Sequence, residues 1–336
     1  MVFGHGDDTY KYKDIWANFS SNVYGGFDHE ELFCHLAEGL DAAANYPEPS
    51  PLTLEKELAG ILSLTPEQVM VTNGATEAIY LIAQTFRRSK TAILQPTFSE
   101  YADACRLHEH KMCSIYDLEQ LPERAQMIWL CNPNNPTGIT IDKEVLTECI
   151  SSHPDVLFII DASYDPYTKK PVITPHEAAE MPNVLMIHSM TKEFAIPGLR
   201  LGYLVGNENI LTKVRLQRMP WSVNTVAIDA GHYLLRNSDQ YELPLDFLIG
   251  ERERMTKLLE ATGCIEVWPS DTHMMLCRLR MGKAEALKNY LAEEHGILIR
   301  DASNFEGLDS SYFRIAVQTK EKNEELIERI AEWIIE

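Results

Sequence analysis

The stretch SMTKEFAIPGLRLG, from Ser189 to Gly202, is the part of the sequence from which the fold follows. It comes shortly after an apolar run at 184–187, which predicts a buried strand that ends in a polar turn. In open α/β sheets, ligands bind at the carboxyl ends of the strands. Lys192 stands in this turn, three residues after Ser189 and eight before Arg200. A lone lysine in a turn is usually a solvated surface residue, but a hydroxyl and a guanidinium at this spacing could converge on a phosphate while Lys192 forms a Schiff base.

Length and charge limit the class of protein and its partners. A chain of 336 residues with 45% hydrophobic content can bury a full core, and it predicts one large domain with a smaller one. The formal net charge of −20 argues against nucleic acid and against an anionic membrane surface as partners. It does not exclude a small anionic substrate, because a local group of arginines can outweigh the global charge.

Cysteine usage and the absence of long apolar runs indicate the compartment. The 7 cysteines are scattered and form no Cys-x-x-Cys pair, which is typical of a reducing environment. The first residues carry acids and aromatics and no apolar core of a signal peptide. Nowhere do about 18 apolar residues follow one another, as a membrane-spanning helix requires. We therefore expect a soluble, cytoplasmic protein.

Short, nearly continuous apolar runs alternate with helical stretches in the first two thirds of the chain. This pattern predicts an α/β fold whose mostly parallel, doubly wound sheet is buried on both faces. The predicted strands are Val69–Val71, Thr91–Leu94, Met127–Leu130, Val156–Ile160, Val184–Ile187 and Leu201–Val205.

Helical spacing and prolines suggest the domain boundaries. Leucines at helical spacing predict a helix over Glu30–Ala44, which the prolines of 45–51 end. A second helix should bury Leu54, Leu58, Ile61 and Leu62. Strands near 272–279, 297–299 and 313–317, with helices at 248–262, 283–295 and the C-terminus, predict a small α+β unit. We expect an N-terminal arm and part of the small domain at 1–44, a large cofactor-binding domain at 45–235, and the small C-terminal domain at 236–336.

Residues able to bind a phosphate or a ring follow the first three predicted strands. Gly74-Ala75-Thr76 open a helix, whose N-terminus could receive a phosphate, although the same residues also suit an ordinary helix start. Phe98 offers a flat apolar surface, and Asn135 lies in the rigid turn Asn132-Pro-Asn-Asn-Pro-Thr-Gly138, from which its amide could reach a phenolate oxygen. Each of these residues has a commoner structural role.

An acid and a tyrosine follow the fourth strand. Asp161 comes directly after five apolar residues, and a carboxylate is costly to bury there unless a cation pairs with it. A protonated pyridine nitrogen would be such a cation, and it is what makes pyridoxal phosphate an electron sink. Tyr164 could donate to the O3′ oxygen of the same ring.

Together these motifs resemble the fold-type I, aspartate-aminotransferase-like family of pyridoxal-phosphate enzymes. Asn-Pro-x-Asn-Pro-Thr-Gly, Asp-x-x-Tyr and Ser-x-x-Lys with an arginine eight residues later occur in the family's order. The resemblance implies that pyridoxal 5′-phosphate is the cofactor and that Lys192, Asp161 and Tyr164 are catalytic. It implies that the cofactor is bound by Gly74, Ala75, Thr76, Phe98, Asn135, Asp161, Tyr164, Ser189, Lys192 and Arg200.

The resemblance also implies a homodimer in which a tyrosine of one subunit reaches the cofactor phosphate of the other. Tyr46, in Asn-Tyr-Pro-Glu-Pro, matches that position. One residue departs from the family pattern: Ser163 places a hydroxyl where the family keeps a methyl group under the ring. We expect this change to tune the cofactor and not to abolish its binding.

Two subfamilies are similar to the chain, histidinol-phosphate aminotransferase and the L-threonine-O-3-phosphate decarboxylase of cobalamin synthesis. Arg300 and Arg314 match the arginines with which both bind the anionic groups of an amino-acid or amine phosphate. The segments 4–6, 18–22 and 297–308 look more like the decarboxylase. The resemblance therefore implies decarboxylation of threonine phosphate to aminopropanol phosphate, with the aminotransferase as the alternative.

The substrate site implied by this resemblance comprises His5, Asn22, Asn135, Arg300 and Arg314. A regulator that uses the fold without catalysis is a third interpretation, but such regulators carry a DNA-binding domain for which this chain has no spare length. We expect no metal, because the tight cluster His108-Glu109-His110 lies in a polar region after a predicted helix.

Overall fold

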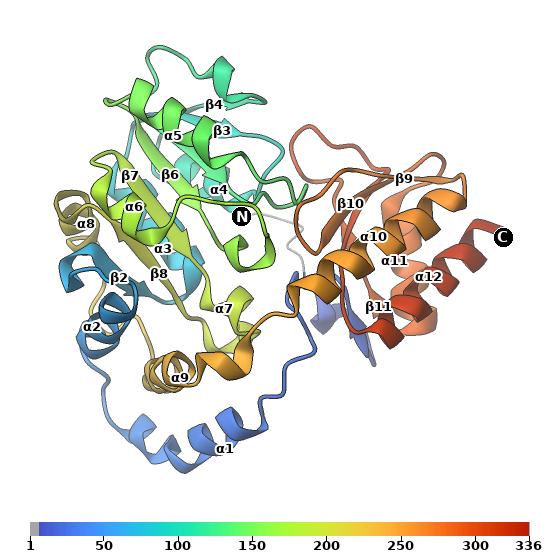
Figure 1. Ribbon diagram of the computed structural model, residues 1–336, viewed down its shortest axis with the longest axis horizontal. Helices are drawn as coiled ribbons and strands as arrows, with labels where there is room; N and C mark the ends of the chain where they lie inside the picture. The colour runs from blue at the N-terminus through green and yellow to red at the C-terminus, as the bar shows by residue number, and fades with distance from the viewer. Residues whose placement is uncertain (1–6, 336) are drawn as a thin grey trace.

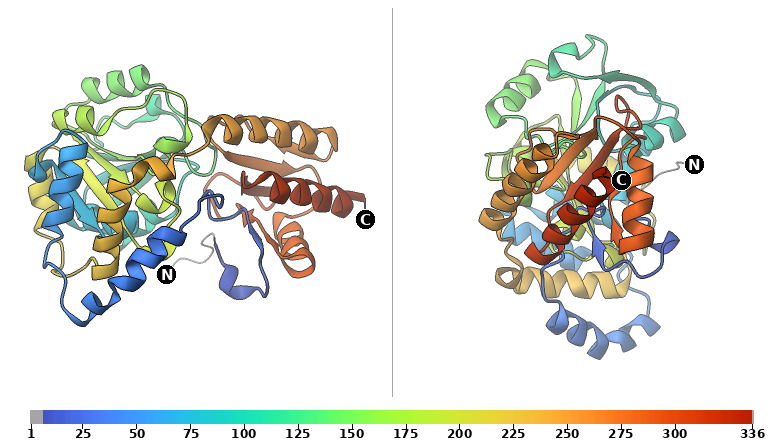
Figure 2. Two further views of the ribbon diagram at one scale, coloured as in Figure 1. Left: turned by 60° about the horizontal axis from the view of Figure 1, so that its bottom comes forward. Right: turned by 90° about the vertical axis from the view of Figure 1, so that its right-hand side faces the viewer.

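The computed structural model describes residues 7–335. It has two lobes, a larger one built on a seven-stranded sheet and a smaller one built on a four-stranded sheet (Figure 1). Helix α10 (Leu245–Ala261) connects the last helix of the larger lobe to the smaller lobe and lies along the latter (Figure 2). None of the helices within residues 7–335 has the length and apolar composition to span a membrane.

The seven-stranded sheet has the order β2-β8-β7-β6-β5-β3-β4. β8 is antiparallel to both of its neighbours, and every other pair is parallel. Side chains of successive residues point to opposite faces, and both faces are covered, so every residue of β2, β5, β7 and β8 is buried. The strands are β2 (Val69–Thr72), β3 (Lys90–Leu94), β4 (Lys111–Ile115), β5 (Met127–Cys131), β6 (Leu157–Asp161), β7 (Val184–His188) and β8 (Gly202–Gly206).

Helices cover the two faces of this sheet in two separate hydrophobic cores. One core contains residues of α3 (Gly74–Thr85), α4 (Glu100–Leu107) and α8 (Glu208–Arg215). The other contains residues of α1, α2, α5, α6 and α9. Those helices are α1 (Glu30–Glu38), α2 (Leu52–Ile61), α5 (Lys143–Ser152), α6 (Pro175–Glu180) and α9 (Thr225–Arg236), and the short α7 (Met190–Glu193) follows β7.

The smaller lobe combines the C-terminal region with the N-terminal segment. Its antiparallel sheet has the order β12-β13-β10-β9 and packs with α10, α11 and α12. β1 (Ala17–Asn18) pairs in parallel with β11 (Ile297–Leu298), so the N-terminal segment lies on this lobe. The remaining elements are β9 (Ile265–Val267), β10 (Met274–Leu279), β12 (Arg300–Asp301), β13 (Tyr312–Ala316), α11 (Ala284–His295) and α12 (Lys320–Ile335). Short 3₁₀ helices cover Thr9–Lys11, Leu40–Ala44, Pro66–Gln68, Leu118–Gln120, Asp165–Tyr167, Pro197–Leu199 and Ser238–Tyr241.

The predicted α/β class and mostly parallel sheet are confirmed, with two corrections among the helices. The helix predicted over Glu30–Ala44 ends at Glu38, because Gly39 interrupts it and Leu40, 57% exposed, has no core to reach. In α2, Ile61 is 56% exposed and Leu62 follows the helix, so Leu54 and Leu58 form the buried face. The domain boundaries at 44 and 235 stay a prediction.

Candidate active site

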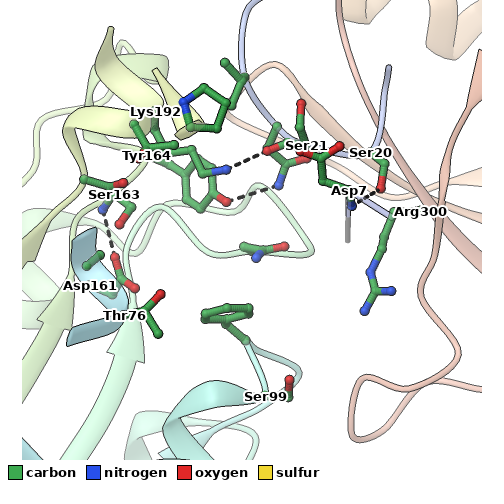
Figure 3. Close-up of a pocket in the computed structure, with 18 of the residues that line it drawn as sticks. Asp7, Ser20, Ser21, Thr76, Ser99, Asp161, Ser163, Tyr164, Lys192 and Arg300 are labelled. Atoms are coloured by element: carbon green, nitrogen blue, oxygen red, sulfur yellow. Dashed lines mark hydrogen bonds between the residues drawn. The ribbon is translucent and has the colours of Figure 1, made fainter. Parts of the chain in front are cut away.

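A cavity of about 250 Å³ lies where the carboxyl ends of the larger sheet face the smaller lobe and the N-terminal segment (Figure 3). Most of the residues predicted from the sequence line this one cavity. They are Asn22, Ala75, Thr76, Phe98, Asn135, Asp161, Tyr164, Ser189, Lys192, Arg200, Arg300 and Arg314.

Lys192 stands in α7, directly after β7. The helix begins after Ser189, whose extended backbone turns the chain into the cavity. The Lys192 Nζ donates a hydrogen bond of 2.6 Å to the carbonyl of Ser21, and Tyr167 Oη donates one of 2.8 Å to the Lys192 carbonyl. Burial, and next the positive charge of Arg314, lower the pKa of Lys192 to about 7. A substantial fraction of the amine is therefore neutral, and hence nucleophilic, near neutral pH.

Asp161 ends β6 and is only 5% exposed. Its Oδ1 accepts from the Ser163 N–H at 2.9 Å (Figure 3). Its Oδ2 accepts from Tyr101 Oη at 2.5 Å. Burial raises its pKa, whereas the bonds from Ser163 and Tyr101 oppose that rise. Among residues 7–335 no lysine, arginine or histidine nitrogen lies within 4.0 Å of this carboxylate. A buried acid without a cationic partner fits a ligand that brings its own cation.

The N-terminus of α3 and Arg200 form one end of the cavity, which we call the phosphate end because the sequence predicts that a phosphate binds there. Gly74 has a φ of +76° and lies so close to Arg200 that a Cβ at this position would overlap the guanidinium. A Cβ on Gly202 would come within 2.6 Å of the Ala75 nitrogen. These two glycines let β8, Arg200 and the first turn of α3 approach one another closely. The first N–H groups of a helix have no partner within it, and they can bind a phosphate.

Phe98 and Tyr164 are placed for the ring of a cofactor. Phe98 packs edge to face against Tyr101, with the ring centroids 5.8 Å apart. Tyr164 Oη accepts from Asn22 Nδ2 at 3.2 Å. Burial raises the pKa of Tyr164 above its ordinary value, so the phenol keeps its proton at neutral pH and can donate it in a hydrogen bond.

Arg300 and Arg314 lie directly opposite each other on the antiparallel strands β12 and β13. Both are buried, at 6% and 4% exposed. Arg314 donates to Asn135 Oδ1 and, at 2.5 Å, to the Ser20 carbonyl, while Arg300 donates to Asn304 Oδ1 at 2.7 Å. Burial, and in addition the positive charge of Arg300, lower the pKa of Arg314 to about 9. Like charges in opposed positions destabilise a sheet, so an anion bound between them would relieve this cost.

Two of the predicted site residues, Gly74 and Tyr46, are not among those that line this cavity, and His5 lies outside the described residues. Gly74 lies against the Arg200 guanidinium, and Tyr46 is at the surface. Tyr46 is 85% exposed and its ring is 5.3 Å from that of Trp221. Its predicted role across a dimer interface therefore stays a prediction.

Sequence reasoning missed Tyr101, Ser21 and Asn304, which also line the cavity. No pattern distinguished Tyr101, because a buried tyrosine in the first turn of a helix looks like any core residue. Ser21 contributes a backbone carbonyl, which no side-chain pattern reveals.

With this geometry established, the family is decided by a family model. The model for aminotransferase class I and II matches residues 14–330. The chain belongs to this family. Enzymes of the family depend on pyridoxal 5′-phosphate, and one structural neighbour, the histidinol-phosphate aminotransferase from Sinorhizobium meliloti, is in complex with it. That neighbour has a TM-score of 0.85 at 18% identity and covers 96% of this chain and 92% of its own.

Relatives of this aminotransferase-family chain include two kinds of enzyme. The threonine-phosphate decarboxylase from Salmonella typhimurium is 30% identical, over 87% of this chain and 84% of its own length. The histidinol-phosphate aminotransferase from Thermoanaerobacter pseudethanolicus is 31% identical, over 86% and 84%. The crystal structure of L-threonine-O-3-phosphate decarboxylase from Porphyromonas gingivalis is 38% identical, with a TM-score of 0.93, and covers 95% of this chain and 100% of its own.

The residues around the cavity fit pyridoxal phosphate. Lys192 offers a partly neutral amine for the aldehyde carbon of the cofactor. The buried Asp161, which has no cationic partner among residues 7–335, offers a carboxylate for the ring nitrogen of the cofactor. Gly74 and Gly202 allow Arg200 and the N-terminus of α3 to lie close together. Both groups could then bind the phosphate of the cofactor. Arg300 and Arg314 line the same cavity, and their guanidinium groups could bind the anionic groups of a substrate.

Proposed function

We propose that this protein uses pyridoxal phosphate to decarboxylate L-threonine O-3-phosphate to aminopropanol phosphate. The opposed, buried pair Arg300 and Arg314 carries the assignment of the substrate class. A substrate with a carboxylate and a phosphate presents two separate anions to two guanidinium groups, each of which binds oxyanions in a fork. The 38% identity to the Porphyromonas gingivalis decarboxylase, over nearly the whole chain, supports the choice of reaction.

When bound, the cofactor supplies an electron sink for the bond that breaks at Cα. Asp161 would hold the positive charge on the ring nitrogen, and Lys192 would hold the aldehyde carbon. Arg314 and Arg300 would bind the anionic groups of the substrate and so fix its orientation, with Asn135 and Asn22 beside them. Lys192 Nζ, with its pKa near 7, is suited to deliver a proton to the substrate Cα after carbon dioxide has left.

The N-terminal segment would close the site over the substrate. The Ser20 and Ser21 carbonyls accept hydrogen bonds from Arg314 and Lys192, and Asn22 has a φ of +53° and contacts Tyr164. These three residues therefore touch the groups that would bind substrate and cofactor. A closed, dry site strengthens the attraction between guanidinium groups and anions.

A histidinol-phosphate aminotransferase is the alternative, favoured by the 31% identity to the Thermoanaerobacter enzyme. In that reaction Lys192 would take the proton from the substrate Cα, and a 2-oxo acid would be needed to restore the cofactor. The two reactions leave the cofactor in different forms, which gives a direct test.

Cofactor absorbance after single-substrate addition distinguishes the two proposals. The cofactor-loaded protein receives either L-threonine phosphate or histidinol phosphate, with no 2-oxo acid. We expect the original absorbance to persist through turnover of L-threonine phosphate. Full conversion to the pyridoxamine phosphate spectrum with histidinol phosphate, and no reaction with L-threonine phosphate, would establish the aminotransferase instead.

We also infer a homodimer in which Tyr46 serves the site of the partner subunit. Tyr46 and Trp221 are large, exposed aromatic residues in contact, and Leu216 and Met219 nearby in sequence are 79% and 75% exposed. Large exposed apolar residues grouped along the chain are typical of a protein interface.

A further inference from the structure

Tyr101 contacts two of the residues that would surround the cofactor ring. It stands in the first turn of α4 and is completely buried. Its hydroxyl donates to Asp161 Oδ2 at 2.5 Å, and its ring meets the edge of Phe98 with centroids 5.8 Å apart. On its other side it stacks on Trp129 at 5.3 Å, with the planes only 15° apart. A rigid side chain held in this way can fix the positions of Asp161 and Phe98 together.

Ser163 supplies a hydrogen-bond donor to the second carboxylate oxygen of Asp161. The Ser163 N–H donates to Oδ1 at 2.9 Å, and the nearby Ser163 hydroxyl also lowers the pKa of the Asp161 carboxylate. Ser163 is 6% exposed and lines the cavity. Each oxygen of Asp161 therefore has its own protein donor, and both donors favour the ionised carboxylate against the cost of its burial.

We propose that Tyr101 and Ser163 are positioning residues that keep Asp161 ionised and in place, and thereby set how firmly the ring nitrogen of bound pyridoxal phosphate holds its proton. This inference rests on cofactor binding in the cavity. It does not depend on which of the two reactions the protein catalyses.

The direction of the effect follows from electrostatics. A carboxylate that loses a hydrogen-bond donor becomes more basic, so it takes more of the proton that it shares with the ring nitrogen. The ring then carries less positive charge. The nitrogen that joins Lys192 to the cofactor has a smaller positive charge nearby and keeps its own proton to a higher pH. The visible absorbance of the bound cofactor reports this protonation.

The test compares Tyr101→Phe with Tyr80→Phe. Tyr101→Phe keeps the ring stacking and removes only the hydroxyl on Asp161. Tyr80→Phe is the matched control, because Tyr80 Oη donates to a different carboxylate, that of Glu100, at 2.7 Å. For Tyr101→Phe we expect the pH midpoint of the cofactor absorbance to rise by roughly half to one pH unit and the dissociation constant of the cofactor to rise roughly tenfold. Tyr80→Phe should change neither quantity.

Ser163→Ala provides a second, independent variant. It removes the hydroxyl but keeps the N–H bond to Oδ1, so we expect an upward shift of the midpoint smaller than that of Tyr101→Phe. If Tyr101→Phe does not fold, the shift in Ser163→Ala alone decides the proposal. If both variants lower the melting temperature but leave the pH midpoint of the cofactor absorbance unchanged, these residues contribute only to packing. That result would overturn the proposal. Because no substrate is added, a wrong choice of reaction cannot produce or hide either result.

Discussion

Arg314 is a buried positive charge whose hydrogen-bond partners within residues 7–335 are neutral, the Asn135 amide oxygen and the Ser20 carbonyl. We expect Arg314→Ala to lower kcat/KM for L-threonine phosphate by roughly 30- to 1,000-fold, because removing one member of a buried ion pair with the substrate costs about 2–4 kcal/mol. Arg314→Lys should recover part of the activity, since it restores the charge but not the planar fork.

Arg278 is the matched control for Arg314. It stands on β10, the strand next to β13, but its side chain is 45% exposed and is not among the residues that line the cavity. Arg278→Ala should leave kcat/KM within about twofold of the wild-type value. Equal activities of Arg314→Ala and Arg278→Ala would show that Arg314 does not bind the substrate.

The depressed pKa of Lys192 predicts a pH dependence. Only the neutral amine reacts with the cofactor aldehyde, and the pKa of Lys192 lies near 7 in place of its ordinary value of 10.5. The rate at which cofactor-free protein binds pyridoxal phosphate covalently should therefore increase as the pH rises through about 7 and then level off. Stopped-flow absorbance measures this rate. Arg314→Ala should move the midpoint upward, and a wild-type midpoint near 10.5 would contradict the structure.

Most of the residues that the sequence singled out at the carboxyl ends of buried strands do line the cavity, and their roles stay predictions. Asp161 and Lys192 are of this kind, because an ionisable residue after an apolar run at a sheet edge has few structural explanations. The sequence could not show that Arg300 lies directly opposite Arg314, because this pairing depends on the register of β12 with β13. Tyr101 was missed because a buried tyrosine at the start of a helix looks like any core residue.

At the scale of elements, the contact between β8 and the first turn of α3 depends on Gly202. A Cβ there would lie 2.6 Å from the Ala75 nitrogen and 2.8 Å from the His188 carbonyl oxygen, and these backbone atoms cannot move aside easily. We expect Gly202→Ala to destabilise the protein by about 1–3 kcal/mol and to weaken cofactor binding, because it separates Arg200 from the helix N-terminus.

Gly60→Ala is the control for this change. Gly60 lies in α2, and a Cβ there would meet nothing within 4 Å. Alanine also favours a helix, so this variant should keep or slightly raise the melting temperature. Thermal unfolding and cofactor titration measure both effects. A Gly202→Ala protein as stable as Gly60→Ala would mean that this contact does not hold the phosphate end together.

Buried strands were predictable from the sequence, and exposed or very short strands were not. Each predicted strand of the large sheet coincides with an observed one to within a residue or two, because both of its faces are covered. β4 escaped prediction since it is an edge strand with three exposed residues in five and no apolar run. β1, β9 and β12 are too short to show a periodic pattern of their own, whereas β11 was predicted at 297–299.

At the scale of the whole molecule, the proposed homodimer predicts that two inactive variants can complement each other. Lys192→Ala removes the amine from a subunit's own site, and Tyr46→Ala removes the tyrosine that serves the partner's site. In a mixed dimer one site carries both defects and the other carries neither. An equal mixture, unfolded and refolded together, should therefore recover about a quarter of the wild-type activity.

The control is the same mixing without subunit exchange. If the two variants are refolded separately and assayed immediately after mixing, no activity should appear. No recovery after joint refolding, although light scattering shows a dimer, would place Tyr46 outside the site of the partner. A monomer in solution would contradict the dimer itself.

The decarboxylase proposal is tested most directly by counting carbon dioxide. Cofactor-loaded protein is given carboxyl-labelled L-threonine O-3-phosphate without any 2-oxo acid, and released carbon dioxide is compared with the number of active sites. We predict many molecules of carbon dioxide per site, with an equal amount of aminopropanol phosphate. No release, or release that stops at one molecule per site while the cofactor becomes pyridoxamine phosphate, would contradict the proposed function.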